Sequence, residues 1–246
     1  MEEILVTVIV PYFNAYKTIY TCLESIKKQT FNNLQIIIVD DCSTDTSIEV
    51  VFNFIKEDKR FSILRHSENR GVSAARNLGI KHAKGMFIYF IDADDWIKEN
   101  AIQDLINSYN KTNSQFIGSG HIQYLNKDKE NIKDCEIKNS LILNSNDIYK
   151  YIINYLKIPY KFTLFVHCWN KLYLSSIIKQ NNIFFDENLS QLEDVNFNFN
   201  YILNIESASF DINNNYYHRI EDKNSSASGK AGTENNAVHN CIRAFK

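Results

Sequence analysis

The sequence predicts an α/β fold with a mainly parallel sheet, because short β-rich segments alternate with segments of helical periodicity along its first half. The β-rich segments carry Ile, Val, Phe and Tyr almost without interruption, as strands buried on both faces do. The predicted strands are Val6–Val10, Leu34–Val39, Phe61–Leu64, Met86–Ile91 and Phe116–Tyr124. With 246 residues and 44% hydrophobic composition, the chain can bury the core of one large domain or of two small ones.

Helices are predicted between these strands from apolar residues spaced i, i+3, i+4 and i+7. The first such stripe consists of Ile19, Cys22, Leu23 and Ile26. The second consists of Ile48, Val51, Phe52 and Ile55. A third helix is expected over residues 72–82. Ser43 or Thr44 is expected to cap the second helix and Ser73 the third, since short hydroxyl side chains satisfy free amides at a helix start.

The composition becomes polar between Leu125 and Asn146, which indicates a mobile excursion and a soft boundary between two regions of the chain. The regions are residues 1–124 and residues 125–246. In the second region, helices are predicted over Asp147–Leu156 and from Glu193 onward. Helical spacing at the C-terminus stops abruptly, so we expect the chain to be truncated there.

Charge and cysteine content exclude several classes of function. A formal net charge of −2 does not predict a nucleic-acid-binding surface. The five cysteines are scattered singly, which argues against a zinc site or a disulfide framework. The N-terminus lacks a signal-peptide pattern, and no apolar run approaches the length of a transmembrane helix. We therefore expect a cytoplasmic protein, with peripheral contact at the inner face of the membrane as an alternative.

Polar and acidic residues follow three of the predicted strands. The first strand runs into PYFN at residues 11–14, the second into DDCSTD at 40–45, and the fourth into DADD at 92–95. Ligands of parallel α/β sheets bind at such strand ends, and closely spaced carboxylates repel unless a cation joins them. The D-x-D spacing suits Mg²⁺ or Mn²⁺ and leaves coordination positions for diphosphate oxygens. Alone, an acidic loop after a strand is also common in proteins without a metal.

The motifs in combination are far more specific than D-x-D. They are TVIVPYFNAYKTIYTCLESIKKQT, IIIVDDCSTD, ENRGVSAARNLGI and FIDADDW, in this order. Together they resemble the nucleotide-binding half of family 2 inverting glycosyltransferases with the GT-A fold. A later QLEDVNF and YYHR extend the resemblance, which is strong as far as Trp96 and loose beyond.

The resemblance implies a GT-A, Rossmann-like sheet flanked by helices, with a nucleotide-sugar-binding half (1–124) and an acceptor-binding half (125–246). It implies transfer of a sugar, with inversion, from a nucleotide diphosphate donor, expected to be UDP-linked, to an acceptor hydroxyl, with Mn²⁺ or Mg²⁺ as cofactor. A glycan or lipid-linked acceptor in bacterial surface polysaccharide or glycoconjugate synthesis would fit. The implied nucleotide-binding residues are Pro11, Phe13, Asp41, Asn69, Arg76 and Asp92. The implied metal ligands are Asp94 and, by looser analogy, His218.

The implied base is Asp194, with Glu193 as its neighbour. A carboxylate of fixed position can deprotonate the acceptor hydroxyl. The alternative is electrostatic, because acids in the first turn stabilise a helix. For Arg76 the alternative is a structural salt bridge within the acidic cluster. Trp96 is expected to pack on the acceptor, although Trp is also an ordinary core residue.

Residues 68–77 predict a phosphate-binding turn independently of the family resemblance. Gly71 can form a tight turn, and the amides at the start of the following helix can face a diphosphate.

Three other functions are alternatives to this one. A receiver-type signalling module shares an acidic pocket, but there the acidic pair follows the first strand, whereas here it follows the second. A non-catalytic sugar-nucleotide-binding protein would keep the fold and would be expected to lose an acid, yet all the acids are present. A nucleotidyltransferase would need a glycine-rich loop, which PYFNAYKT does not provide.

Overall fold

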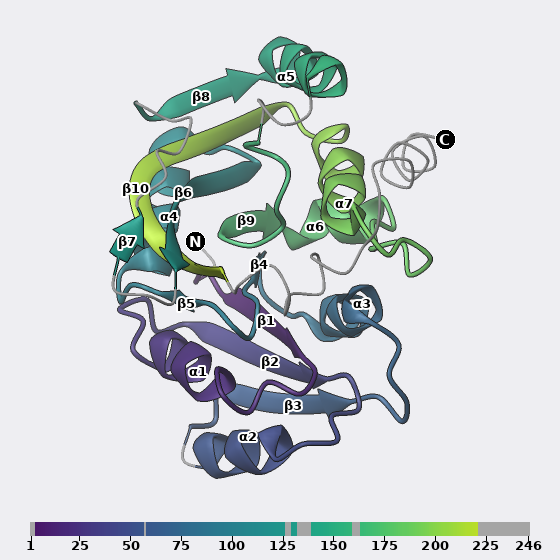
Figure 1. The fold of residues 1–246 in the computed structure, drawn as a ribbon. Coiled ribbons are helices and arrows are strands. Elements are labelled where there is room, and N and C mark those ends of the chain that lie inside the picture. The colour runs from purple at the N-terminus through teal and green to yellow at the C-terminus, as the bar shows by residue number, and fades with distance from the viewer. Residues whose placement is uncertain (1–2, 57, 126–128, 132–138, 159–162, 221–246) are drawn as a thin grey trace.

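The computed structural model describes residues 3–56, 58–125, 129–131, 139–158 and 163–220. Their centre is a ten-stranded sheet with the order β3-β2-β1-β4-β9-β6-β10-β5, in which β7 also pairs with β6 and β8 with β10 (Figure 1). The strands are β1 (Val6–Tyr12), β2 (Leu34–Asp40), β3 (Phe61–Arg65), β4 (Phe87–Phe90), β5 (Trp96–Ile97), β6 (Phe116–Leu125), β7 (Lys129–Asn131), β8 (Leu141–Asn144), β9 (Lys171–Leu174) and β10 (Ser207–Ile220). The helices are α1 (Ile19–Lys27), α2 (Ser47–Ile55), α3 (Val72–His82), α4 (Ala101–Thr112), α5 (Ser145–Lys157), α6 (Ser175–Gln180) and α7 (Glu193–Ile202).

The first half has the parallel architecture that the sequence predicts. Strand β1 pairs in parallel with β2 and β4, and β2 pairs in parallel with β3. All seven residues of β1 are buried, which explains its unbroken apolar sequence. The carboxyl ends of β1, β2 and β4 therefore lie side by side at one edge of the sheet.

The two faces of the sheet have separate cores. Alternate residues of β1, such as Val8, pack with α1 and α4 on one face. Ile9 points to the other face and packs in the core that includes residues of α3, α5, α6 and α7. Each half of the chain contributes helices to the second core, so this core joins the two halves.

The second half adds antiparallel strands to the sheet. Strand β9 lies between β4 and β6 and runs antiparallel to both. Strand β10 has 14 residues and runs parallel to β6 from Ala208 to Ile220, with register shifts around Asn214. The sequence did not reveal this strand because asparagines interrupt its apolar pattern where the register shifts.

Part of the segment predicted as a mobile excursion is ordered structure. Leu141–Asn144 forms β8 and pairs with β10, and α5 begins directly afterwards. Asn144 and Asp147 form a capping box at this helix start, a local signal that the polar composition concealed. Residues 126–128 and 132–138 of the excursion lie outside the described residues, as do residues 221–246, where truncation is expected.

Two details of the second helix were predicted wrongly. Phe52 is 50% exposed, whereas Phe54 packs against the core. No side-chain cap comes from Ser43 or Thr44; instead the Asp45 carboxylate accepts the Ser47 N–H at 2.9 Å. Ser73 likewise makes no capping bond at α3, which begins after Gly71.

Within the described ranges, no helix has both the length and the apolar character needed to cross a membrane.

Gly85 provides a test of how tightly β4 packs on β1. A Cβ atom at this position would lie 2.6 Å from the Thr7 nitrogen and 2.8 Å from the Leu5 carbonyl oxygen, both backbone atoms. We expect Gly85→Ala to lower the free energy of unfolding by about 1–3 kcal/mol, as overpacking does, in urea titrations. The control is Lys84→Ala at the exposed neighbouring residue. Equal urea midpoints of unfolding for both variants would show that the backbone at Gly85 adjusts without loss of stability.

Candidate active site

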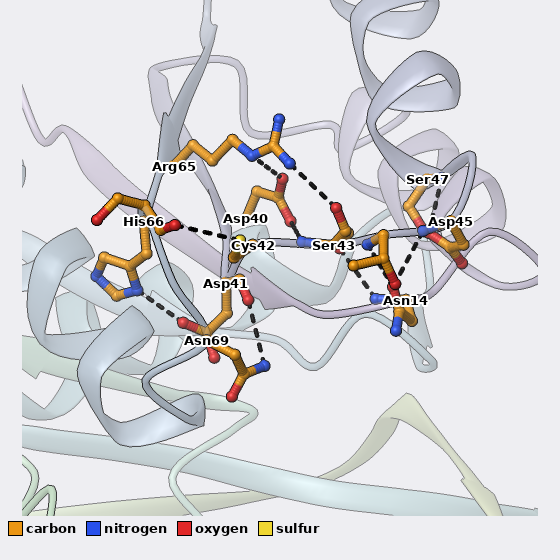
Figure 2. Close-up of polar contacts among 12 residues, drawn as sticks. Asn14, Asp40, Asp41, Cys42, Ser43, Asp45, Ser47, Arg65, His66 and Asn69 are labelled. Atoms are coloured by element: carbon orange, nitrogen blue, oxygen red, sulfur yellow. Dashed lines mark hydrogen bonds and ion pairs between the residues drawn. The ribbon is translucent and has the colours of Figure 1, made fainter.

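The loops after β1 and β2 are joined by the side chain of Asn14. Its amide oxygen accepts the backbone N–H groups of Thr44 at 2.8 Å and Asp45 at 3.2 Å, and the backbone N–H of Asn14 donates to the Ser43 hydroxyl. Figure 2 shows Asn14 directed at this second loop. Asn14 has a φ of 50°, a left-handed conformation that asparagine tolerates better than most residues. The two strand ends therefore form one fixed rim.

Asp41 determines the shape of the loop that leads into α3. Its buried carboxylate accepts the backbone N–H groups of Arg70 and Gly71, the latter at 2.7 Å. The carboxylate also lies 2.7 Å from Nδ1 of His66, a contact drawn in Figure 2. The Asn69 amide donates to the Asp41 carbonyl oxygen at 3.2 Å. Gly71 has a φ of 88°, which confirms the tight turn predicted there. Asp41 thus has a structural role, and its contact with a uracil ring stays a prediction.

Two other predicted nucleotide-binding residues are open to a ligand. Phe13 directly follows β1 and is 47% exposed. Asn69 is also exposed, on the loop that Asp41 holds. Pro11, by contrast, is buried within β1.

Arg76 joins the predicted nucleotide residues to the predicted base. Its side chain is 4% exposed, and it donates from Nη2 to Asp92 at 2.9 Å and from Nη1 to Asp194 at 2.8 Å. Glu193 lies 3.6 Å from Nη1. The guanidinium also lies 5.1 Å from the centre of the Phe185 ring. The salt-bridge alternative is therefore the arrangement that the structure contains.

Asp194 and Glu193 open α7, as predicted, after a left-handed Leu192 with a φ of 61°. The second carboxylate oxygen of Asp194 accepts the Cys168 N–H at 3.0 Å, so both oxygens have fixed partners. Burial, and then the charge of Asp194, raises the pKa of Glu193 above its ordinary value. The helix-start interpretation and a catalytic role are compatible with this geometry.

The acidic loop after β4 contains one exposed and one buried carboxylate. Asp94 is exposed, whereas Asp95 is buried, accepts the Tyr216 hydroxyl at 2.5 Å and accepts the Arg219 N–H at 2.8 Å. Burial, with the charges of Asp94 and Asp92, raises the pKa of Asp95 well above its usual range. Asp95 therefore attaches the loop to β10, and Asp94 remains accessible.

The described residues contain no group of three His, Cys, Asp or Glu side chains placed to hold a metal by themselves. An accessible Asp94 with Asp92 nearby still fits Mg²⁺ or Mn²⁺, because such ions are commonly held by one or two carboxylates together with substrate phosphates.

His218 lies in a cluster of rings that the sequence analysis did not find. His121 on β6 and His167 before β9 lie 6.3 Å and 6.2 Å from it, and Trp169 lies 5.3 Å from it, between ring centres. Burial lowers the pKa of His121 to about 4 and that of His167 to about 3, and lowers the pKa of His218. These imidazoles are therefore neutral near pH 7. Only the pairing of β6 with β10 brings His121 and His218 together, so no local motif could reveal the cluster.

Trp96 has packing partners on β6 and β10. Its ring stacks on Tyr217 at 5.0 Å, and the Arg219 guanidinium lies 5.0 Å from its centre. Tyr124 contacts the Trp96 ring edge-on. Trp96 thus stabilises the β5–β10 corner, and its acceptor contact stays a prediction.

Comparisons with known proteins agree with this architecture. The chain is 32% identical over 222 residues to the putative glycosyltransferase EpsH of Bacillus subtilis, covering 89% of this chain and 62% of EpsH. It is 27% identical to the poly(ribitol-phosphate) beta-N-acetylglucosaminyltransferase TarS of Staphylococcus aureus, over 86% of this chain and 35% of TarS. The chain thus spans less than two thirds of these relatives.

Solved structures confirm the expected GT-A fold. TarS in complex with UDP-GlcNAc superposes with a TM-score of 0.76 at 23% identity, covering 93% of this chain and 62% of that one. The mannosyltransferase PcManGT of Pyrobaculum calidifontis, in complex with GDP-Man and Mn²⁺, gives a TM-score of 0.61 at 16% identity, over 87% and 56% of the chains.

The family model described as Glycosyl transferase family 2 matches residues 7–180, which include the strand-end loops and Arg76. The chain therefore belongs to glycosyl transferase family 2.

Proposed function

We propose that this protein transfers a sugar from a nucleotide diphosphate donor, UDP-linked, to an acceptor hydroxyl with inversion at the anomeric carbon, assisted by Mn²⁺ or Mg²⁺. The observation that carries the proposal is the Arg76 guanidinium, which holds Asp92 and Asp194 on either side of it. One carboxylate follows a strand of the donor-side sheet and the other begins α7. A donor at Asp92 would therefore lie close to a base at Asp194.

On the donor side, Phe13 and Asn69 are exposed at the strand ends and would contact the base and ribose, with Pro11 behind them. Asp41 and Arg76 would contribute mainly by fixing these loops, and Asp92 would face the ribose. Asp94, with His218 as a further ligand, would hold the cation. A bound divalent cation stabilises negative charge that develops on the leaving diphosphate. The Mn²⁺ bound to PcManGT supports this assignment.

On the acceptor side, Asp194 would remove the proton from the attacking hydroxyl. A general base must be held at a fixed place within hydrogen-bond reach of that proton. Arg76 and the Cys168 N–H hold one carboxylate oxygen each, and each oxygen keeps a second lone pair for the hydroxyl. Glu193 would assist as its neighbour.

The names of the relatives support a role in bacterial surface polysaccharide or glycoconjugate synthesis. TarS is named for transfer to poly(ribitol-phosphate) and binds UDP-GlcNAc. We propose a glycan or lipid-linked acceptor, bound by residues 125–246 and by Trp96, while residues 1–124 bind the donor. Action in the cytoplasm, at the inner face of the membrane, would suit such an acceptor.

Family membership favours this function over the receiver alternative. A sugar-nucleotide-binding protein without activity is the remaining rival, and a donor screen separates the two. Purified protein with Mn²⁺ and a panel of nucleotide sugars should release nucleotide diphosphate slowly from the true donor. Binding of a nucleotide sugar without any release, with or without candidate acceptors, would favour the rival.

Arg76→Met tests the bridge between the two sides. The change leaves buried carboxylates without their cation, and we expect it to lower the free energy of unfolding by about 3–5 kcal/mol. Arg70→Met is the matched control, because Arg70 and Glu187 form an exposed pair at 2.9 Å that should contribute less than about 1 kcal/mol. Urea titration measures both. Similar small losses for the two variants would mean that the bridge does not stabilise the fold.

Asp94→Asn tests the metal assignment. We expect UDP affinity in the presence of Mn²⁺ to fall at least about 10- to 100-fold, the range seen when even outer partners of a metal ligand are lost. Calorimetry with UDP measures this, and Glu49→Gln on the exposed start of α2 is the charge-matched control. Equal UDP affinity of the unaltered protein with Mn²⁺ and with EDTA would disprove metal-dependent binding.

Asp194→Asn tests the base. Asparagine keeps an oxygen for Arg76 and removes basicity, so transfer should fall roughly 10²- to 10⁴-fold while UDP affinity stays nearly constant. Glu193→Gln is the control, and we expect a smaller loss. Near-full transfer by Asp194→Asn would place the base elsewhere, with Glu193 as the first candidate. An unfolded variant would favour the purely structural helix-start role.

A further inference from the structure

The ring cluster around Trp169 has contacts with the donor-side acids and with the proposed base. His167 stacks on Trp169 with ring centres 4.6 Å apart, and Trp169 stacks on Tyr216 at 4.4 Å. The His121 ring contacts Trp169 edge-on at 5.0 Å. Cys168, which lies between His167 and Trp169 in the sequence, donates its backbone N–H to Asp194. The negative charge of Asp92 acts on the His167 imidazole. The cluster therefore borders both sides of the candidate active site.

The imidazoles of His121 and His167 have ring neighbours but no hydrogen-bond partners. Across the described ranges, no protein group is hydrogen-bonded to a ring nitrogen of either residue, although both side chains are half-buried. No ring nitrogen of either residue is fully buried without a partner, so these nitrogens are accessible to water or to a ligand. The two imidazoles, with ring centres 6.4 Å apart, therefore offer hydrogen-bonding groups to a polar ligand.

The chemistry of the cluster suits uncharged hydroxyl groups. A neutral imidazole offers one donor and one acceptor, and so does a hydroxyl group. The buried Lys171 ammonium lies 5.5 Å from the centre of the Trp169 ring and donates to the Trp169 carbonyl oxygen. An uncharged ligand adds no further charge beside this ammonium. A sugar ring presents several hydroxyls to such a surface.

We propose that His121 and His167 form a binding subsite for the hydroxyl groups of a sugar ring. The inference rests on the proposed function, and it adds the residues that recognise the sugar. Two sugars could occupy the subsite, the one that is transferred and the one that accepts it. The position favours the transferred sugar, because the reacting carbon must lie between the leaving diphosphate near Asp92 and the base at Asp194.

The stacked rings make a clean test possible. His167→Phe keeps the stacking on Trp169 and removes both ring nitrogens, and His121→Phe does the same at the edge contact. His82→Phe is the matched control, since His82 is an exposed imidazole at the end of α3. Calorimetry with Mn²⁺ compares UDP, UDP-GlcNAc and UDP-glucose on each variant. His121→Ala and His167→Ala replace any Phe variant that does not fold.

The unaltered protein should bind one of the UDP-sugars more tightly than UDP. In each Phe variant, the affinity for that UDP-sugar should fall about 3- to 10-fold, which corresponds to the loss of one or two hydrogen bonds. The affinity of the variant for UDP should stay within about twofold of the unaltered protein. His82→Phe should behave as the unaltered protein does. An equal loss of UDP and UDP-sugar affinity would overturn the proposal, because it would show a general structural defect.

A second measurement identifies the sugar and needs no nucleotide. Saturation-transfer NMR with methyl β-D-glucopyranoside and methyl N-acetyl-β-D-glucosaminide reports contact of a free sugar with the protein. Loss of this signal in the Phe variants, with the UDP-sugar gain intact, would support the subsite and assign it to the acceptor. No change in either measurement would overturn the proposal. Failure of the unaltered protein to bind any nucleotide would defeat the proposed function, while the glycoside signal would still decide the subsite.

Discussion

The ion cluster around Arg76 is the interaction on which the arrangement of the two halves depends. Removing a guanidinium from water costs several kcal/mol unless carboxylates and hydrogen bonds compensate for it. Arg76 lies on α3 and finds Asp92 after β4 and Asp194 at the start of α7, with the Phe185 ring against its face. None of these groups can move far without leaving a buried charge unpaired. The cluster thus fixes α7 against the donor-side sheet.

The loops around this cluster hold unusual backbone conformations. Asn14, Cys42 and Leu192 have positive φ values although none is glycine. Such conformations cost of order 1–3 kcal/mol each and persist only where the surroundings determine them. Here the surroundings include the Asn14 amide, which joins two loops, and the Asp41 carboxylate, which holds the turn at Gly71. Asn14 and Cys42 lie in the loops that follow β1 and β2, so two of these conformations occur where the strand ends form the candidate site.

The sequence revealed the parts of the fold whose pattern is local. The first five predicted strands are present because their apolar runs reflect burial on both faces. It did not reveal β10, whose asparagines break the pattern at a register shift, or the antiparallel β9. The loops that carry the acids were recognisable, but the partners of Arg76 lie 16 and 118 residues away along the chain. Only the tertiary fold could bring Asp194 to Arg76 or His167 to Trp169.

The charges of the cluster explain why the proposed site would need a cation beside the arginine. Arg76 faces Asp92, Asp194 and Glu193, and Asp94 follows Asp92 by two residues, so carboxylates outnumber the guanidinium. The raised pKa of Glu193 is one response to this excess, since holding a proton removes one charge. A diphosphate brought into the same space would add further negative charge. A divalent cation at Asp94 would offset it, which leaves Arg76 to orient the base. The separation of these two tasks follows from exposure, because Asp94 is accessible to an ion and Arg76 is not.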